Sequence, residues 1–377
     1  MELESYKLEA RGPFHFGQPG IGLESTASFV HSDTLFSAIC SATLALYGKT
    51  TLEAFLALFG LPNAAEVVEP PFLLSSAFPY YKSLRFYPRP ELPDLESQAK
   101  PPLEEQASKV LRKAEFVSEK IFTQLLQGQT LERKDSALVQ NNKLWVTPDE
   151  KKFYDELKLD PQNERAFWKI DSAPHVAVDR ITSGSALYYL GRLLFQPGGG
   201  LHFLIHWLNP EQLVYDRLTV QTLVEESLRY LSDSGLGGDR ASGSGQFVYP
   251  ATTEKLTLNK SLPGQRYFIS LSLYHPRAEE WEAFRDQHQT SYSLLKQDGW
   301  ITSPGISSIQ RRPVWMLGEG AYLAFKEAPS KLTGLGDLVN VTPNWEKVPP
   351  EKRPQQTHNI YRYGRALVLP ATLKGDV

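Results

Sequence analysis

The feature that most constrains this chain is a glycine-rich run between residues 235 and 247, GLGGDRASGSGQF. Glycine accepts positive φ and lets another molecule approach the backbone closely. Successive free amide groups in such a loop form a concavity that binds anions, whereas the alternative interpretation is a flexible surface turn. The candidate contacts of the loop are Gly235, Gly237, Gly238, Arg240, Ser242, Gly243, Ser244 and Gly245.

The spacing of this run does not match the fingerprints of nucleotide-binding enzymes. No Lys-Ser or Lys-Thr pair follows the glycines, and no strand–GxGxxG–helix pattern opens a parallel unit. Arg240 stands among the glycines and supplies a forked donor that suits phosphate. We therefore expect the loop to bind a phosphodiester backbone rather than ATP or NAD.

Composition narrows the class of protein. A length of 377 residues favours two domains, and 41% hydrophobic with 22% charged residues is typical of a globular chain. The formal net charge is −3, whereas free-standing nucleic-acid binders are usually basic. Any RNA site must therefore come from local patches or be completed by partner subunits.

Nothing in the sequence indicates a metal, a cofactor or a membrane segment. Cys40 is the one cysteine, which excludes a disulfide framework and suits a reducing cytoplasm. No apolar run approaches the roughly 18 residues that span a bilayer, and the first ten residues lack a signal-peptide pattern. No HD motif, paired metal-ligand spacing or Ser-His-Asp signature is present. We expect a cytoplasmic protein.

Hydrophobic periodicity predicts an α+β fold. Within residues 1–250 a strand at 3–10 precedes a helix that starts at Ser32, and a helix at 211–231 precedes the glycine-rich loop. A hairpin is expected over 186–207. This order suits a split βαβ, ferredoxin-like (RRM-like) domain.

An insertion and a second domain complete the expected organisation. Proline-broken residues from about 85 to 170 form the insertion, with a charged helix over 103–127 and a hairpin over 136–147 that turns at two asparagines. Residues 251–377 begin with a clear strand at 266–274, and we expect a second ferredoxin-like domain there.

Three motifs, in order along the chain, carry a resemblance to a known family. The segment His31–Ile39, HSDTLFSAI, is similar to the opening helix of the RAMP superfamily. The segment His175–Thr182, HVAVDRIT, resembles a strand of its type III members, and residues 235–247 resemble its glycine-rich loop. Together they resemble the Csm-type subunit that binds the 5′ handle of CRISPR RNA in type III-A effector complexes. The type III-B counterpart is the alternative.

The resemblance implies two ferredoxin-like folds and no catalytic role. It also implies three partners: the 5′ handle of the CRISPR RNA, the large polymerase/nuclease subunit, and the first backbone RAMP subunit. Target RNA is met indirectly, through a protruding hairpin thumb that interrupts the guide–target duplex. We place the thumb at Ser136–Thr147, with Lys143 and Trp145 as its contacts; a peripheral decoration is the alternative.

Several other residues have two possible roles each. His15 and Phe16 follow the first strand and either stack on unpaired bases or plug a structural loop. His31 and Ser32 either donate to RNA phosphate at a helix N-terminus or, in the case of Ser32, cap that helix.

The residues of the strand motif and the arginines of the C-terminal region also have two interpretations each. Arg180, with Thr182 beside it, either contacts phosphate or forms a surface ion pair with Asp179, and His175 either contacts RNA or fills the strand end. The arginines of the C-terminal region are either solvated charges or part of an RNA-binding or partner-binding surface; they are Arg311, Arg312, Arg362 and Arg365.

The rival function is enzymatic. RAMP relatives include metal-independent ribonucleases that process precursor CRISPR RNA, and such catalysis needs a histidine near the 2′-hydroxyl or the leaving oxygen. His15, His31 and His175 are the candidates. A third class, a protein-only scaffold, would leave the glycine-rich loop without a purpose.

Overall fold

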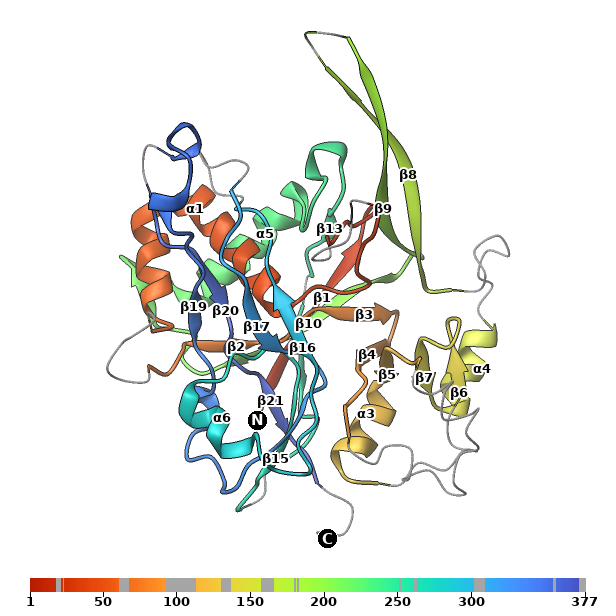
Figure 1. Ribbon diagram of the computed structural model, residues 1–377. Helices are drawn as coiled ribbons and strands as arrows, with labels where there is room; N and C mark the ends of the chain where they lie inside the picture. Colours follow the sequence, from red (N-terminus) through yellow and green to blue (C-terminus); the bar gives the residue numbers. More distant parts are fainter. Residues whose placement is uncertain are drawn as a thin grey trace.

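The computed structural model describes residues 1–17, 22, 24–60, 68–92, 113–129, 137–156, 166–179, 181, 183–250, 252–260, 263–301, 309–354 and 357–372. It is a mixed α+β structure with one large mixed sheet, few helices and a long two-stranded ribbon that projects from the body (Figure 1). Arg180, Thr182 and Ser136 lie outside the described residues, as do residues 103–112 of the helix predicted at 103–127. In the remainder of that range, Glu119–Leu126 is helical, whereas Phe116–Ser118 forms a strand, so the prediction is wrong there.

The large sheet holds the first half of the chain together. Its strands, in spatial order, are β13 (Phe247–Val248), β1 (Leu3–Ala10), β10 (Gly199–Trp207), β3 (Phe78–Tyr81), β4 (Leu84–Pro88), β5 (Phe116–Ser118), β7 (Leu144–Val146) and β6 (Ala137–Val139). β2 (Phe72–Leu74) also pairs with β10, and β14 (Glu254–Leu256) pairs with β1. Strand pairing thus carries this sheet beyond residue 250.

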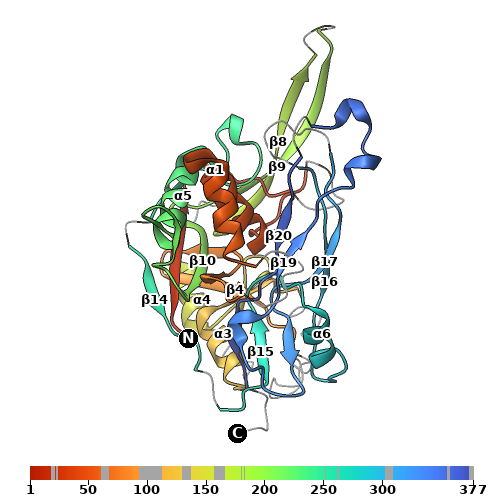
Figure 2. The ribbon, with the colours of Figure 1, turned by 90° about the vertical axis from the view of Figure 1, so that its left-hand side faces the viewer.

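Two helices pack against each other beside the sheet (Figures 1 and 2). They are α1 (Ser32–Ala57) and α5 (Val220–Ser234). Their apolar residues, including Leu35 and Leu228, share one buried core with Leu8 and Phe203 of the sheet. Helix α1 is kinked at Gly48, whose φ is 83°.

The insertion widens the large sheet instead of projecting from it. It contains β4, β5, β6 and β7 with α3 (Glu119–Leu126) and α4 (Pro148–Glu156). The predicted hairpin at 136–147 is β6–β7, and its turn residues Asn141 and Asn142 have positive φ as expected. However, Leu144, Trp145 and Val146 are buried in the core. The prediction of a thumb at this hairpin is wrong. Because β7 pairs with β5 and with β6, its apolar side chains are buried within the sheet and the hairpin does not project.

The projecting ribbon is formed by β8 (Trp168–Val178) and β9 (Ser185–Phe195), paired continuously from Trp168↔Phe195 to Val178↔Ser185. The predicted hairpin over 186–207 is therefore wrong: β9 pairs with β8, whereas β10 lies between β1 and β3. The reason is burial. Seven of the nine β10 residues are buried, which requires neighbouring strands on both edges and cover on both faces.

The C-terminal unit has a smaller sheet of its own. β15 (Tyr267–Ser270) lies between β18 (Tyr322–Ala324) and β21 (Val368–Pro370), with α6 (Ala278–Phe284) beside it. The remaining pairs are β16 (Leu294–Gln297) with β17 (Val314–Leu317), β19 (Leu338–Asn340) with β20 (Tyr361–Tyr363), and, in the first half, β11 (Leu213–Tyr215) with β12 (Leu218–Thr219). Short 3₁₀ turns are η3 (Arg240–Ser242), η4 (Leu332–Gly334), η5 (Trp345–Lys347) and η6 (Pro350–Lys352).

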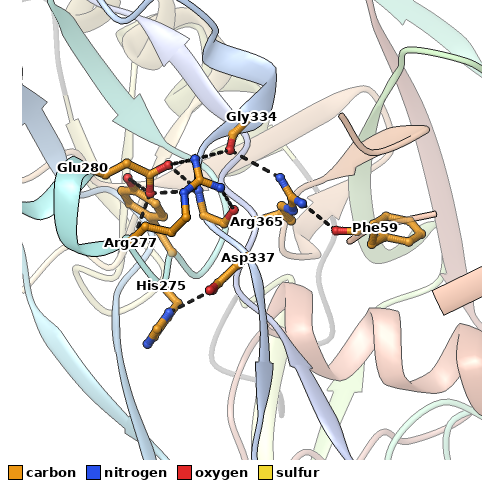
Figure 3. Close-up of polar contacts among 9 residues, drawn as sticks. Phe59, His275, Arg277, Glu280, Gly334, Asp337 and Arg365 are labelled. Carbon is orange, nitrogen blue, oxygen red and sulfur yellow. Dashed lines mark hydrogen bonds and ion pairs between the residues drawn. The ribbon is translucent and has the colours of Figure 1, made fainter. Parts of the chain in front are cut away.

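Buried polar contacts join the two halves. The Leu273 amide donates to Ser32 Oγ at 3.1 Å, and Asp33 forms an ion pair with Arg362. Arg365 donates to the carbonyl oxygens of Phe59 and Gly334, at 2.5 Å and 3.3 Å (Figure 3). These contacts fix both ends of α1 against the C-terminal unit.

Candidate nucleic-acid interface

Three segments that are distant in sequence meet at the foot of the β8–β9 ribbon. Phe14 and Leu193 exchange backbone hydrogen bonds of 2.9 and 2.7 Å, which joins the loop after β1 to β9. His15 Nδ1 donates to Gly191 O at 2.8 Å on the same strand. The Gly238 amide donates to His15 O at 2.9 Å, so the glycine-rich loop lies on this junction too.

The glycines of the loop serve packing within the protein. Gly237 and Gly245 have φ of 97° and 86°, and a Cβ on Gly237 would come within 2.6 Å of His15 O. Many loop amides donate inward: those of Gly235, Leu236, Gly238, Ser242, Gly243, Ser244 and Gly245 all have backbone acceptors. The expectation of a row of free amides is therefore wrong for most of the run, because close packing of the backbone uses them.

One short turn of the loop remains open. Arg240, Ser242 and Gly243, in and just after η3, are exposed, and Gly243 has open space around it. Among the described residues the Arg240 guanidinium has no hydrogen-bond or ion-pair partner. The Asp239 carboxylate accepts from Ser242 Oγ at 2.7 Å and from Ser244 Oγ at 3.2 Å, which shapes the turn. The available anion-binding group here is therefore the Arg240 side chain.

His15 and Phe16 are not available for base stacking. Each is only 6% exposed, and Phe16 stacks on Phe14 with ring centroids 5.4 Å apart. A buried histidine whose Nδ1 is bound to a backbone carbonyl holds loops together. The structural-plug alternative is the one that this geometry supports.

The N-terminus of α1 is closed by the C-terminal unit. His31 is the N-cap residue, and its Nδ1 donates to Glu319 Oε1 at 2.8 Å, while Ser76 also donates to Glu319. Burial raises the pKa of Glu319, but His31 and the hydrogen bonds outweigh burial and leave that pKa below its usual range. Ser32 is fully buried, so it has no route to an RNA phosphate. The prediction that Ser32 caps the helix is wrong too, because His31 is the N-cap residue and Ser32 Oγ accepts from the Leu273 amide.

Lys143 borders a cleft of about 460 Å³ between the insertion, the foot of the ribbon and the C-terminal unit. Its ammonium lies 2.9 Å from Glu115 Oε1. Arg89, Lys113 and Phe29 also line this cleft. Lys143 thus faces a concave surface, whereas Trp145, at 4% exposure, is part of the core.

The β8–β9 ribbon carries an apolar surface that no residue in the described part of the chain covers. Val178, Ile181 and Leu187 are 63%, 94% and 62% exposed, and the His175 and Tyr188 rings lie 5.5 Å apart across the strands. A two-stranded ribbon with exposed apolar side chains is marginal by itself in water, and such surfaces mark interaction sites. In the sequence, the two long strand-like segments on either side of Ser183-Gly184 indicate this ribbon.

Arginines of the C-terminal region divide into two kinds. Arg362 and Arg365 are 6% and 2% exposed, so the hypothesis of a basic surface at these two positions is wrong. They are buried because their partners come from the other half of the chain. Arg311 and Arg312 lie beside β17, and Arg312 is exposed.

The histidines of the nuclease hypothesis have separate partners. His15 binds Gly191, His31 binds Glu319, and His175 lies next to Tyr188 on the ribbon. Within the described ranges there is no group of three or more His, Cys, Asp or Glu that could hold a metal ion. In the same part of the chain, no helix is long and apolar enough to cross a membrane.

Comparison with known proteins finds similarity to Csm4 proteins. Residues 264–371 match the CRISPR Csm4 C-terminal domain. A "CRISPR system Cms protein Csm4" of Methanocaldococcus jannaschii is 22% identical over 406 aligned positions, which cover 100% of this chain and 99% of the relative.

Solved structures share the fold over the whole length. A Csm3-Csm4 subcomplex of a type III-A interference complex contains a chain with a TM-score of 0.60 and 19% identity, covering 99% of this chain and 100% of that one. A Csm1-Csm4 cassette in complex with cA4 contains one with a TM-score of 0.54 and 19% identity, covering 99% of each. Residues 264–371 therefore match the Csm4 C-terminal domain, and over its whole length the chain is similar in sequence and in fold to Csm4 proteins.

Proposed function

We propose that this chain is a non-catalytic RNA-binding subunit of the complex, which anchors the 5′ handle of the guide RNA and docks the large subunit onto the backbone. The observation that carries the proposal is the junction at the foot of the β8–β9 ribbon. There the glycine-rich loop presents the unpartnered Arg240, close to the β9 strand that His15 fixes in place. A single exposed arginine beside small residues suits one phosphate of a bound strand.

The topology supports a ferredoxin-like first domain over residues 1–250. The spatial order β13–β1–β10–β3 places the first and third strands of a split βαβ unit in the centre. α1 follows β1, and α5 links β10 to β13. This is the connectivity of the ferredoxin-like fold, into which the insertion at about 85–170 and the ribbon are added. Residues 251–377 then form the second domain.

The partners follow from the exposed surfaces. Relatives have been solved with Csm3 and with Csm1, and we assign this chain the same two kinds of neighbour: a backbone RAMP subunit and the large subunit. The uncovered apolar residues of the ribbon, such as Val178 and Leu187, suit a role as the thumb at the guide–target duplex. A net charge of −3 is consistent with an RNA site shared among subunits in the cytoplasm.

The proposal is tested with Arg240→Glu. Charge reversal removes one phosphate contact and adds repulsion, so the complex purified with the variant should hold less guide RNA, with a salt dependence shallower by about one counterion. Arg217→Glu, in the exposed turn between β11 and β12, is the matched control. Normal guide RNA content in the Arg240 variant would refute the role of the loop.

The rival nuclease function is tested separately. The purified chain is incubated with repeat-containing RNA in EDTA, and the RNA is examined for cleavage. Intact, retarded RNA supports the binding role. Cleavage that is lost in His15→Ala or His31→Ala would replace the proposal with a metal-independent nuclease.

A further inference from the structure

A second surface, in the C-terminal unit and separate from the handle site, carries two exposed tryptophans. Trp315 of β17 pairs with Lys296 of β16, and Trp300 continues the ribbon through a bridge to Gln310. Trp300 and Trp315 are 55% and 58% exposed, and Leu294 is 51% exposed. Indole rings are seldom left this open without a partner.

The two tryptophans are exposed on the β16–β17 ribbon and on its continuation past β16. Along 294–301 the even-numbered residues Leu294, Lys296 and Trp300 are exposed, whereas Gln297 and Ile301 are buried. Opposite residues of an antiparallel pair point to the same face, so Trp315 lies on the face of Lys296. Trp300 lies three residues beyond the end of β16, after Gly299, and is bridged to Gln310. The result is an exposed strip with two aromatic groups.

The charge of this strip is positive. The paired segments 294–301 and 309–317 contain Lys296, Arg311 and Arg312 against a single carboxylate, Asp298. Asp298 lies 3.4 Å from Lys296. Among the described residues neither arginine has an ion pair, and Arg311 Nε is buried without a hydrogen-bond partner. Arg312 donates to Asn340 O at 2.8 Å, which leaves its charge uncompensated.

We propose that this strip binds single-stranded RNA, with bases stacked on Trp300 and Trp315 and phosphates held by Lys296, Arg311 and Arg312. Strand-borne aromatics with flanking cations are the general means of holding unpaired bases without sequence preference. Charge complementarity favours RNA, because the strip carries three cations against one carboxylate and RNA is a polyanion. The site is independent of Arg240 and of the handle.

The test measures binding of a fluorescein-labelled oligouridine of about 15 nucleotides, which lacks the handle sequence, to the full-length chain by fluorescence anisotropy. Trp300→Ala and Trp315→Ala should each weaken binding about five-fold or more. Trp315→Phe, which keeps a ring, should retain most of the affinity. Arg312→Gln should reduce the slope of log affinity against log salt by about 0.7.

The matched control is Leu213→Ala/Tyr215→Ala, which removes exposed apolar side chains from β11. This control should leave the affinity unchanged. Failure of the wild-type chain to bind the oligouridine, or equal binding by the tryptophan variants, would overturn the proposal. So would tryptophan variants that bind RNA normally but no longer co-purify with the other subunits, since that result makes the strip a protein interface.

Discussion

The glycine-rich loop allows a sharp comparison between two alanine substitutions. Gly243 and Gly245 have nearly equal φ, 84° and 86°, so alanine meets the same intrinsic penalty at both, about 1–2 kcal/mol for a left-handed residue. Their surroundings differ. A Cβ at Gly243 meets nothing within 4 Å, whereas a Cβ at Gly245 would lie 2.7 Å from Leu236 N and closer still to Leu236 O.

The additional cost at Gly245 comes from the hydrogen bonds that must give way. Its amide donates to Pro13 O at 2.8 Å and its carbonyl accepts from Leu236 N at 2.9 Å. Each buried group left unpaired costs about 1–3 kcal/mol. We therefore expect Gly243→Ala to lower the free energy of unfolding by about 1–2 kcal/mol and Gly245→Ala by about 3–6 kcal/mol.

The assay is urea unfolding of the full-length variants, followed by tryptophan fluorescence and far-UV circular dichroism. Binding of handle RNA is measured in parallel. Gly243→Ala should keep the fold while adding a methyl group beside Arg240, so it reports on RNA contact alone. Equal destabilisation by the two substitutions would refute the reasoning that self-packing, rather than backbone freedom, explains these glycines.

Two further outcomes follow from the ribbon and from a buried histidine. Deletion of residues 176–187 should leave the melting temperature of the chain unchanged, because the side chains described there are mostly exposed. The same deletion should alter guide–target pairing next to the handle in the assembled complex. A deleted chain that cannot fold would show that the tip of the ribbon belongs to the core. Burial lowers the pKa of His202 from 6.5 to about 4, so the folded state holds it neutral. The stability that goes with a neutral His202 is fully present above the unfolded-state pKa of 6.5. It is lost as the pH falls towards 4, which lowers the free energy of unfolding by about 3 kcal/mol. The melting temperature of His202→Gln should depend less on pH in that range than that of the wild type, and identical pH profiles would contradict this assignment.

Much of the local structure is visible in the sequence. The strand at 3–10, the helix from Ser32, the hairpin turn at Asn141-Asn142 and the strand beginning near Tyr267 are all present. Each depends on near neighbours: hydrophobic periodicity, or residues that tolerate positive φ. The three ordered motifs were likewise enough to indicate the family.

Strand partners and burial of polar groups were not predictable in the same way. Periodicity shows which face of a strand is apolar but not which strand it meets, so β9 was assigned to β10 and the projecting ribbon with β8 was missed. For the same reason, the sequence predicts the β6–β7 hairpin but not whether this hairpin projects or joins the large sheet.

The sequence alone determined the elements, the family motifs and the presence of a glycine-rich loop. Only the tertiary structure decided what these residues do, because their partners are far away along the chain. Arg365 and Phe59 are 306 positions apart, and His15 and Gly191 are 176 apart. Contacts at such separations form only when the whole fold closes, and that closure buries Ser32, His15 and Arg365 while it leaves Arg240 and the two tryptophans open to solvent.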